Sequence, residues 1–181
     1  MDKKPLYNKK RTKFDPNEII IGDQVCVMKL YNSKNVEIAE TVFDKEDFEK
    51  IKQYKWYLCQ TGYATNFKTR KRIHQLLMEC PKGMEVDHKD GNKLNNKREN
   101  LRPATKSQQG QNRGPSKANK LGLRGVWKIR NGKYTSQIGL MGKKFFLGSF
   151  PSAEQAALAY NEKAKELFGE FAKLNVILRG R

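Results

Sequence analysis

The sequence predicts an α+β protein made of two small domains, and three observations carry this prediction. Short runs rich in β-branched and aromatic residues, separated by turn formers, fill positions 19–67. A polar stretch at 81–104 is held between apolar residues, which is typical of a site rather than a linker. Residues 120–176 follow a β-β-β-α pattern of their own. A chain of 181 residues has room for one ordinary domain or two small ones.

The chain is strongly basic. Lysine and arginine number 37 against 19 acidic residues, a formal net charge of +18. Such a surface attracts polyanions and releases their counterions on binding, so nucleic acid is the expected partner. An anionic membrane surface is the alternative. It is disfavoured because the basic residues alternate with aromatic ones in strand-like segments instead of lining an amphipathic helix.

The sequence contains no signal for a membrane or for secretion. No apolar run approaches the length of a membrane span, and the first residues lack the apolar core of a signal peptide. We therefore expect a cytoplasmic protein that binds no membrane. Cys26, Cys59 and Cys80 lack the paired spacing of a zinc site, which indicates reduced thiols.

The first part of the chain predicts short strands mixed with short helices. Residues 1–17 are polar and basic, which indicates a disordered arm. Strands are expected at 19–21, 25–30, 36–42, 56–58 and 63–67. Helices are expected at 45–54, 73–80 and 105–112. Asp44 and Thr105 are placed to cap the first and the last of these helices.

The polar stretch contains an acid and a histidine side by side. Asp87 and His88 follow Val86, which anchors a strand end where both side chains can turn toward one cleft. An aspartate can hold a hard divalent cation while a histidine takes a proton from water. Together they suit hydrolysis of a phosphodiester. His74, the other histidine, has apolar neighbours and is better explained by packing or hydrogen bonding.

The last part of the chain predicts a three-stranded antiparallel sheet packed on one helix. Residues 114–119 form a linker, and strands are expected at 124–130, 133–140 and 143–150. Asn131-Gly132 predicts a type I′ hairpin turn, and Met141-Gly142 makes the second reversal. Ser152, with Gln155 three residues later, predicts a capping box that opens a helix ending at Gly169.

One face of this sheet is expected to be basic and exposed. The alanine-rich helix must cover the more apolar face. The residues left outward are Lys133, Thr135, Gln137, Lys144 and Phe146, joined by Arg124, Lys128 and Arg130. A small sheet with such a face can enter a DNA major groove, and the alternative is a solvated basic surface.

The polar stretch also resembles a known family. Val86-Asp87-His88-Lys89-Asp90-Gly91-Asn92, followed by Glu99-Asn100-Leu101-Arg102 and then by Thr105 and Gln109, is similar to the HNH endonuclease signature. The resemblance covers roughly residues 40–113 and is strongest with the homing-type branch of phages and introns. It implies a ββα-metal nuclease domain in a protein encoded by a phage and acting in a bacterial host.

The resemblance assigns roles to individual residues. His88 at the first motif position would be the general base, and Asp87 before it a metal ligand. Asn100 at the middle position would brace the loop that carries the histidine. Gln109 stands where the family usually has histidine or asparagine as the second metal ligand, and Asn112 is the alternative ligand. The expected ion is Mg²⁺, for which Mn²⁺ can substitute.

Residues 118–176 resemble a second family, the Apetala-two/ethylene-response-factor DNA-binding domain. The likeness rests on Arg124-Gly125-Val126, Phe146-Leu147-Gly148, Ala156-Ala157 and Leu174-Asn175, among other matches. By position it implies DNA contacts through Arg124, Trp127, Lys133, Gln137, Lys144 and Phe146. Plant members tend to carry arginine, arginine and tryptophan where this chain has Trp127, Lys144 and Phe146, so the target sequence does not transfer.

Together these features predict a metal-dependent DNA endonuclease with double-stranded DNA as its partner and no small-molecule substrate. We expect a monomer or weak dimer. The expected bounds are 1–17 for the arm, 18–113 for the nuclease domain, 114–119 for the linker, 120–176 for the second domain and 177–181 for the tail. A catalytically inactive, DNA-binding transcriptional regulator is the second hypothesis, and RNA binding is the third.

Overall fold

The computed structural model describes residues 12, 15–116 and 118–177. The arm expected at 1–17 and the tail expected at 177–181 therefore lie largely outside the described residues. The chain folds as two compact units. The first contains the described residues up to Lys82 together with Val86–Pro103, and the second contains Gly83–Glu85 and the described residues from Ala104 onward. No helix in the described part is long and apolar enough to cross a membrane.

The first unit is built on a three-stranded antiparallel sheet. Its strands are β1 (Ile19–Ile21), β2 (Val25–Tyr31) and β3 (Glu37–Asp44), in the order β1-β2-β3. Alternate residues of β2 are fully buried, because successive side chains of a strand point to opposite faces. The strands predicted in this region are confirmed to within two residues.

Short helices and a hairpin cover this sheet. They are the 3₁₀ turn η1 (Lys45–Asp47), α1 (Phe48–Lys52), β4 (Trp56–Leu58), β5 (Ala64–Asn66) and α2 (Ile73–Leu77). The predicted helices 45–54 and 73–80 are too long. The first begins as a 3₁₀ turn, and the second ends where Met78 becomes extended, three residues before Pro81.

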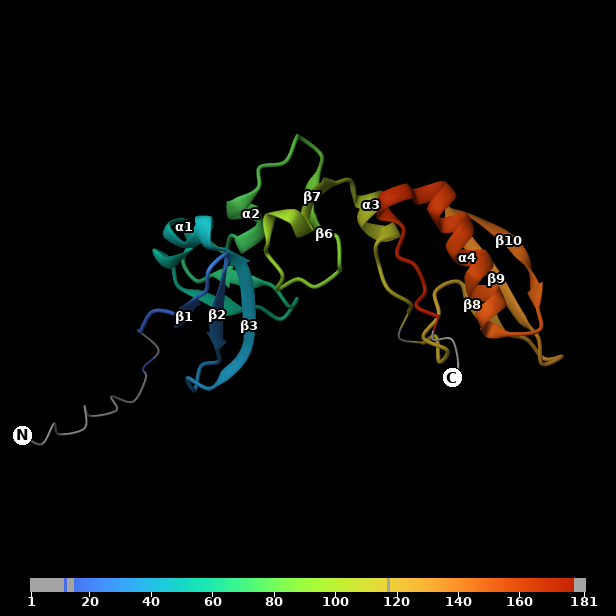
Figure 1. Ribbon diagram of the computed structural model, residues 1–181, viewed down its shortest axis with the longest axis horizontal. Helices are drawn as coiled ribbons and strands as arrows, with labels where there is room; N and C mark the ends of the chain where they lie inside the picture. The colour runs from blue at the N-terminus through green and yellow to red at the C-terminus, as the bar shows by residue number, and fades with distance from the viewer. Residues whose placement is uncertain (1–11, 13–14, 117, 178–181) are drawn as a thin grey trace, which may run out of the picture. The chain divides into compact units, whose positions relative to one another are not determined.

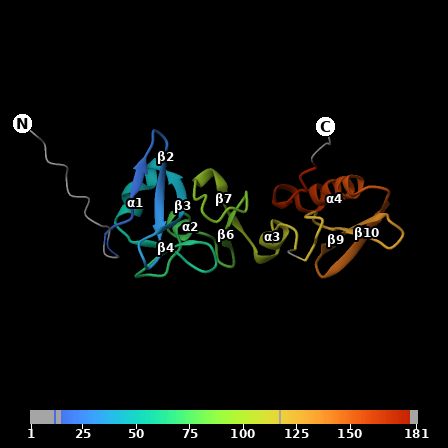
Figure 2. The ribbon, with the colours of Figure 1, turned by 90° about the horizontal axis from the view of Figure 1, so that it is seen from below.

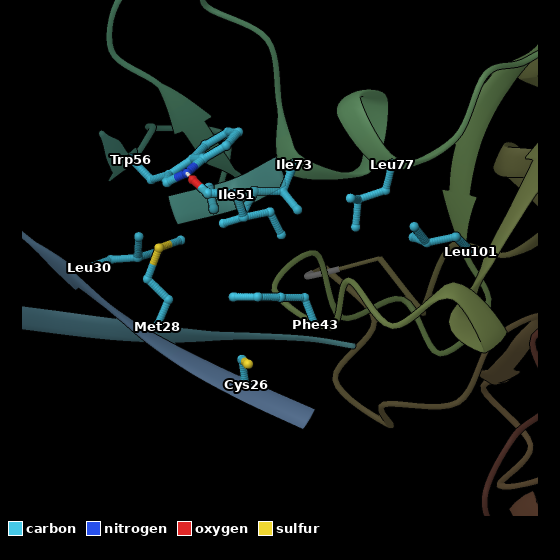
Figure 3. Packing of buried hydrophobic residues seen from close by; sticks show 10 residues of the cluster. Cys26, Met28, Leu30, Phe43, Ile51, Trp56, Ile73, Leu77 and Leu101 are labelled. Carbon is cyan, nitrogen blue, oxygen red and sulfur yellow. Dashed lines mark hydrogen bonds between the residues drawn. The ribbon is translucent and has the colours of Figure 1, made fainter. Parts of the chain in front are cut away.

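These elements enclose one apolar core, which Figure 3 shows from close by. Side chains from the sheet and from the covering elements point into the same space (Figure 3). The fully or almost fully buried members include Cys26, Met28, Leu30, Phe43, Ile51, Trp56, Ile73, Leu77 and Leu101. The indole Nε1 of Trp56 donates to Ile51 O at 2.9 Å, so the largest core side chain has its polar atom satisfied.

The polar stretch and the helix that follows it come next in the chain. β6 (Glu85–His88) and β7 (Leu101–Ala104) form a two-stranded sheet, and η2 (Arg98–Asn100) leads into β7. α3 (Lys106–Gln111) groups with the second unit. Thr105 caps α3 by accepting from Gln108 N, as predicted, and the Gln108 side chain returns a bond to the cap.

The second unit is a three-stranded antiparallel sheet with a helix along one face (Figures 1 and 2). Its strands are β8 (Val126–Lys128), β9 (Tyr134–Leu140) and β10 (Lys143–Phe150), in the order β10-β9-β8. α4 (Ala153–Phe168) packs on all three strands, and η3 (Gly169–Phe171) follows it. The β-β-β-α prediction is confirmed.

The two hairpin turns of this sheet differ from the prediction. Asn131 keeps a negative φ, whereas a type I′ turn needs two positive values, so the predicted type I′ turn at Asn131-Gly132 is wrong. The loop has three residues, 130–132, closed by Ile129 and Lys133, and only Gly132 is left-handed. The Asn131 side chain accepts a hydrogen bond from Lys133 N at 3.1 Å, which stabilises the negative φ of Asn131 in this loop. The next turn, at residues 141–142, has positive φ at both positions.

A close approach between β8 and α4 fixes the start of the sheet. Gly125 has φ +71, and a Cβ at this position would collide with the Tyr160 ring and with Gln137 O. Val126, Ala156 and Ala157 are buried beside it and form one apolar cluster. The small residues of α4 therefore let the helix lie close to the strands, as the alanine pattern predicts.

Candidate active site

Asn100 ties together the loop that follows β6. Its side chain donates to Asp90 Oδ1 at 3.0 Å and to Asn95 O at 2.8 Å, and its Oδ1 accepts from Asp90 N at 3.1 Å. Burial raises the pKa of Asp90, but hydrogen bonds from Asn95, the Asn92 backbone and Asn100 outweigh it and bring that pKa below its usual value. The loop after His88 is therefore a fixed structure, braced by the asparagine that the sequence singled out.

A chain of hydrogen bonds fixes which nitrogen of His88 is basic. Thr41 Oγ1 donates to the Leu94 carbonyl at 2.8 Å, because a carbonyl only accepts. The same hydroxyl accepts from Asn96 Nδ2 at 2.9 Å, which turns Asn96 Oδ1 toward His88 Nε2 at 3.3 Å. Neutral His88 therefore carries its hydrogen on Nε2 and keeps the lone pair on Nδ1.

The imidazole of His88 lies in an aromatic pair with the other histidine. The rings of His74 and His88 are 4.9 Å apart and perpendicular, and Tyr63 lies 5.0 Å and 6.0 Å from them. Only 4% of His88 and 3% of His74 is exposed. Burial lowers the pKa of His88, although the Asn96 hydrogen bond and the nearby Asp90 and Asp87 carboxylates oppose the change. Both imidazoles are therefore neutral at neutral pH, the form that a proton acceptor needs.

Replacing His74 with phenylalanine should make the stability of the protein less sensitive to acid. Burial, with smaller contributions from His88 and Arg72, lowers the pKa of His74 from 6.5 to about 3. Between these values the unfolded chain binds a proton that the folded protein does not. The free energy of unfolding therefore falls as the pH drops through this window, by about 1.4 kcal/mol per pH unit for one such proton.

Urea denaturation of the wild type and of His74→Phe, from about pH 7 to about pH 4, measures this difference. The ring of phenylalanine keeps the contacts with Tyr63 and His88, so the variant is expected to fold. Parallel losses of stability in the two proteins would contradict a buried neutral His74.

Two cations lie on the Tyr63 ring beside this pair. The Arg72 guanidinium is 4.2 Å from the ring centroid and the Lys93 ammonium is 4.8 Å from it. Lys93 also donates to Thr61 O at 2.9 Å, which holds its position. Positive charge is thus placed next to the histidine that the motif names, where a phosphate can be attracted.

Asp87, the expected metal ligand, forms an ion pair that the sequence did not predict. Its Oδ2 accepts from Arg102 Nε at 3.1 Å and from Arg102 Nη2 at 3.0 Å. The two side chains are only 12% and 7% exposed. Arg102 therefore holds the Asp87 carboxylate in one orientation.

The residues expected to hold a metal all carry oxygen atoms, the ligands that hard divalent cations prefer. Across the described residues, no group of three or more histidine, cysteine, aspartate or glutamate side chains gathers into a metal cluster. Asp87 carries a carboxylate in the first unit, and Gln109 and Asn112 carry amide oxygens in the second unit. Oxygen ligands of these kinds are the ones that Mg²⁺ binds in proteins.

Gln109, which occupies the third position of the motif, lies in the second unit. Gln109 Nε2 donates to Glu85 Oε2 at 3.4 Å, and Glu85 belongs to the same unit. Asn112 ends α3 as its C-cap and is buried. Glu85 and Asp87 are two apart on β6, so they project from the same face of that strand. The structure thus adds a carboxylate, Glu85, to the surroundings of Gln109.

Arg124, an expected DNA contact, forms hydrogen bonds with backbone carbonyls at the end of α3. Its guanidinium donates to the carbonyls of Gly110, Gln111 and Arg113. The carbonyls at a helix C-terminus carry partial negative charge, which favours a cation there. Arg124 thereby attaches α3 to the sheet of the second unit.

The other sheet residues expected to face outward divide into two groups. Trp127 and Phe146 are 46% and 65% exposed, and lysines and arginines on the same strands and turns are exposed with them. The prediction that Thr135 faces outward is wrong. Thr135 is 7% exposed, and its hydroxyl donates to Gly148 O at the bulge in β10. The exposed set is Trp127, Lys128, Arg130, Lys133, Lys144 and Phe146, and Gln137 is half-buried.

Sequence reasoning missed several members of the site. Asn96 and Arg102 follow His88 by eight and fourteen positions, and only the doubled Asn95-Asn96 hinted that an amide mattered there. Tyr63 and Thr41 come from other elements, and no local pattern marks them. They are found only because the fold brings them to the polar stretch.

Comparisons with known proteins agree with the motif. The family model for HNH endonuclease matches residues 79–111. An uncharacterized HNH endonuclease of Acanthamoeba polyphaga mimivirus is 36% identical over 182 residues, covering 97% of this chain and 94% of its own length. Protein 3.8 of Escherichia phage T7 is 34% identical over 94 residues, covering 51% of this chain and 77% of its own.

A stretch of the chain is also similar to a plant protein. Dehydration-responsive element-binding protein 2A of Arabidopsis thaliana is 36% identical over 77 residues, covering 40% of this chain and 23% of its own length. No solved structure matches the chain significantly.

Proposed function

Because this chain belongs to the HNH endonuclease family and is a nuclease, we propose that it is a metal-dependent endonuclease of double-stranded DNA, of the homing type. The observation that supports this most directly is the neutral His88 imidazole. It is held by Asn96 beside Asp87, with cations close by.

In the proposed reaction His88 is the general base. Its Nδ1 accepts a proton from the attacking water, while Nε2–H stays bound to Asn96. Asn100 is a positioning residue that fixes the loop after the histidine. Arg72 and Lys93 attract the phosphate that is cut.

The metal ion of this proposal is Mg²⁺, with Mn²⁺ as a substitute. HNH nucleases generally depend on a divalent metal. Asp87 and Gln109 would hold it, with Asn112 as the alternative to Gln109. When bound, such an ion offsets charge on the phosphate and on the leaving oxygen. Arg102 keeps the Asp87 carboxylate in place for that role.

The second unit is proposed to hold the DNA in register. Its exposed basic and aromatic side chains lie on one small sheet, which is suited to a major groove. The likeness to a plant element-binding protein supports an Apetala-two-like domain in this part of the chain. Arg124, which binds the end of α3, ties this domain to the helix that carries Gln109.

Mimivirus and phage T7 proteins among the relatives support an origin in a virus or mobile element. Action in the cytoplasm of the host, as a monomer or weak dimer, goes with that proposal. The inactive regulator is disfavoured, because the motif histidine and its acid are both present.

Supercoiled plasmid should be nicked or cut by the protein in the presence of Mg²⁺, and EDTA should stop the reaction. The physical reason is that the transition state gains negative charge on the phosphate and the leaving oxygen, and a divalent cation offsets that charge whereas the anionic side chain of Asp87 cannot. Agarose-gel analysis over time measures both conditions. Protein that binds the plasmid but leaves it intact with Mg²⁺ and with Mn²⁺ would favour the regulator.

A further inference from the structure

An exposed aromatic cluster lies on the first unit. Phe67 is 66% exposed, and its ring meets Tyr57 edge-on at 6.1 Å. The Arg70 guanidinium lies 5.8 Å from both ring centroids and donates to Tyr57 Oη at 2.7 Å. We call Tyr57, Phe67 and Arg70 the Phe67 cluster. The Phe67 ring faces solvent although the Arg70 guanidinium already covers part of it.

Hydrogen bonds hold the turn that carries Phe67 and Arg70. Asn66 is 3% exposed, and its Oδ1 accepts from Lys68 N at 2.8 Å and from Thr69 N at 2.9 Å. Its backbone N donates to Lys71 O at 2.8 Å, which closes the turn. Phe67 is therefore presented in one direction, so little freedom is lost when the ring binds a partner.

Arg70 occupies a backbone conformation that favours glycine. Its φ is +61, in the left-handed region, where a residue with a Cβ is less stable than glycine. Strain of this kind persists where a side chain has a role that backbone preference does not explain. Stacking on two aromatic rings at an exposed site is such a role for an arginine.

The charge around Phe67 identifies the kind of partner. Residues 68–72 include four cations, Lys68, Arg70, Lys71 and Arg72, and no acid. A flat apolar ring surrounded by positive charge complements a polyanion that has flat apolar faces, which is the chemistry of a nucleic acid. Arg72 connects this surface to the active site, because it lies on Tyr63, whose ring is 6.0 Å from His88.

We propose that the Phe67 cluster is a second DNA-contacting surface, in the nuclease unit itself. Phe67 inserts at a base step of the duplex and stacks on a nucleobase, while Lys68, Arg70 and Lys71 bind the flanking phosphates. This inference rests on the proposed function, since it takes double-stranded DNA as the substrate. It adds that this unit grips and locally opens the duplex next to the place of cutting.

The test measures binding of a fluorescent duplex of mixed sequence by anisotropy at several salt concentrations, with EDTA present so that no cleavage intervenes. Phe67→Ala should weaken binding about 10-fold with an unchanged salt slope, because stacking releases no counterion. Arg70→Gly should weaken binding and lower the slope by about 0.9, the value for one phosphate contact. Its thermal midpoint should equal or exceed that of the wild type, because glycine relieves the left-handed strain.

Val36→Ala is the matched control, because Val36 is another exposed apolar residue of the same unit, at 56%. It should bind as the wild type does. If Phe67→Ala and Arg70→Gly bind the duplex as tightly as Val36→Ala does, the proposal is overturned. It is also overturned if Phe67→Ala alters only the self-association of the protein, measured by sedimentation. Stronger competition by duplex RNA than by duplex DNA would overturn it as well. Failure of the wild type to cut plasmid would instead overturn the proposed function and leave the binding comparison standing.

Discussion

Replacing His88 with alanine should slow DNA cleavage by about 10²- to 10⁴-fold, the range for losing a general base. The reason is the hydrogen bonding of the imidazole. His88 is neutral, its Nε2–H is bound to Asn96, and of its two ring nitrogens Nδ1 is therefore the basic one. Single-turnover cleavage of supercoiled plasmid, with protein in excess over DNA, measures the chemical step. DNA affinity should change little, because His88 is almost completely buried.

Asn96→Leu is the companion variant. It keeps the imidazole but removes the bond that fixes its tautomer, so cleavage should fall by only about 10- to 100-fold, the scale of one buried hydrogen bond. Circular dichroism and thermal melting show whether both variants fold. If folded His88→Ala cuts at the wild-type rate, His88 is not the base.

Replacing Asp87 with asparagine should lower Mg²⁺-supported cleavage by about 100-fold or more, because a cation that offsets charge in the transition state contributes several kcal/mol. Asparagine keeps the shape of the side chain and an oxygen for Arg102, so it limits the damage to the buried pair. Cleavage rates across a range of Mg²⁺ and Mn²⁺ concentrations measure the effect. The half-saturating metal concentration should rise as well.

Glu85→Gln is the control for charge on the same strand. Glu85 contacts Gln109 and is exposed, so its loss should reduce cleavage much less than the loss of Asp87. Calorimetric titration of Mn²⁺ into each protein, bound to uncut DNA, gives a readout separate from activity. An Asp87→Asn protein with the metal affinity and rate of the wild type would show that the ion is held elsewhere.

Local sequence signals predicted most of the fold. The three strands of the second sheet and its helix followed from alternation, turn residues and the Ser152 cap, and all four are present. Helix lengths and one turn type were wrong. Residue propensities do not predict that the backbone becomes extended at Met78. They also do not predict that the Asn131 side chain stabilises a three-residue loop in place of a two-residue turn.

The candidate site, like the fold, was predicted only in part from the sequence. Asp87, His88 and Asn100 were named from one continuous stretch, and the Asn100 side chain binds Asp90 and Asn95 of the loop that it was expected to brace. The bond from Asn96 to Thr41 joins residues 55 positions apart, so no local pattern announces it. Arg124 was expected to contact DNA, and its guanidinium binds carbonyls at the end of α3, 11 to 14 positions earlier in the chain.

The basic character of the chain, the order of its elements and the motif that carries the chemistry could all be read from the amino-acid sequence. These are properties of neighbouring residues and of periodicity. The tertiary structure decided which nitrogen of His88 is basic, that Arg102 holds Asp87, and that Phe67 and Arg70 stand together in solvent. Each of these depends on side chains brought together from separate elements, and burial and hydrogen-bond direction exist only once the chain has folded.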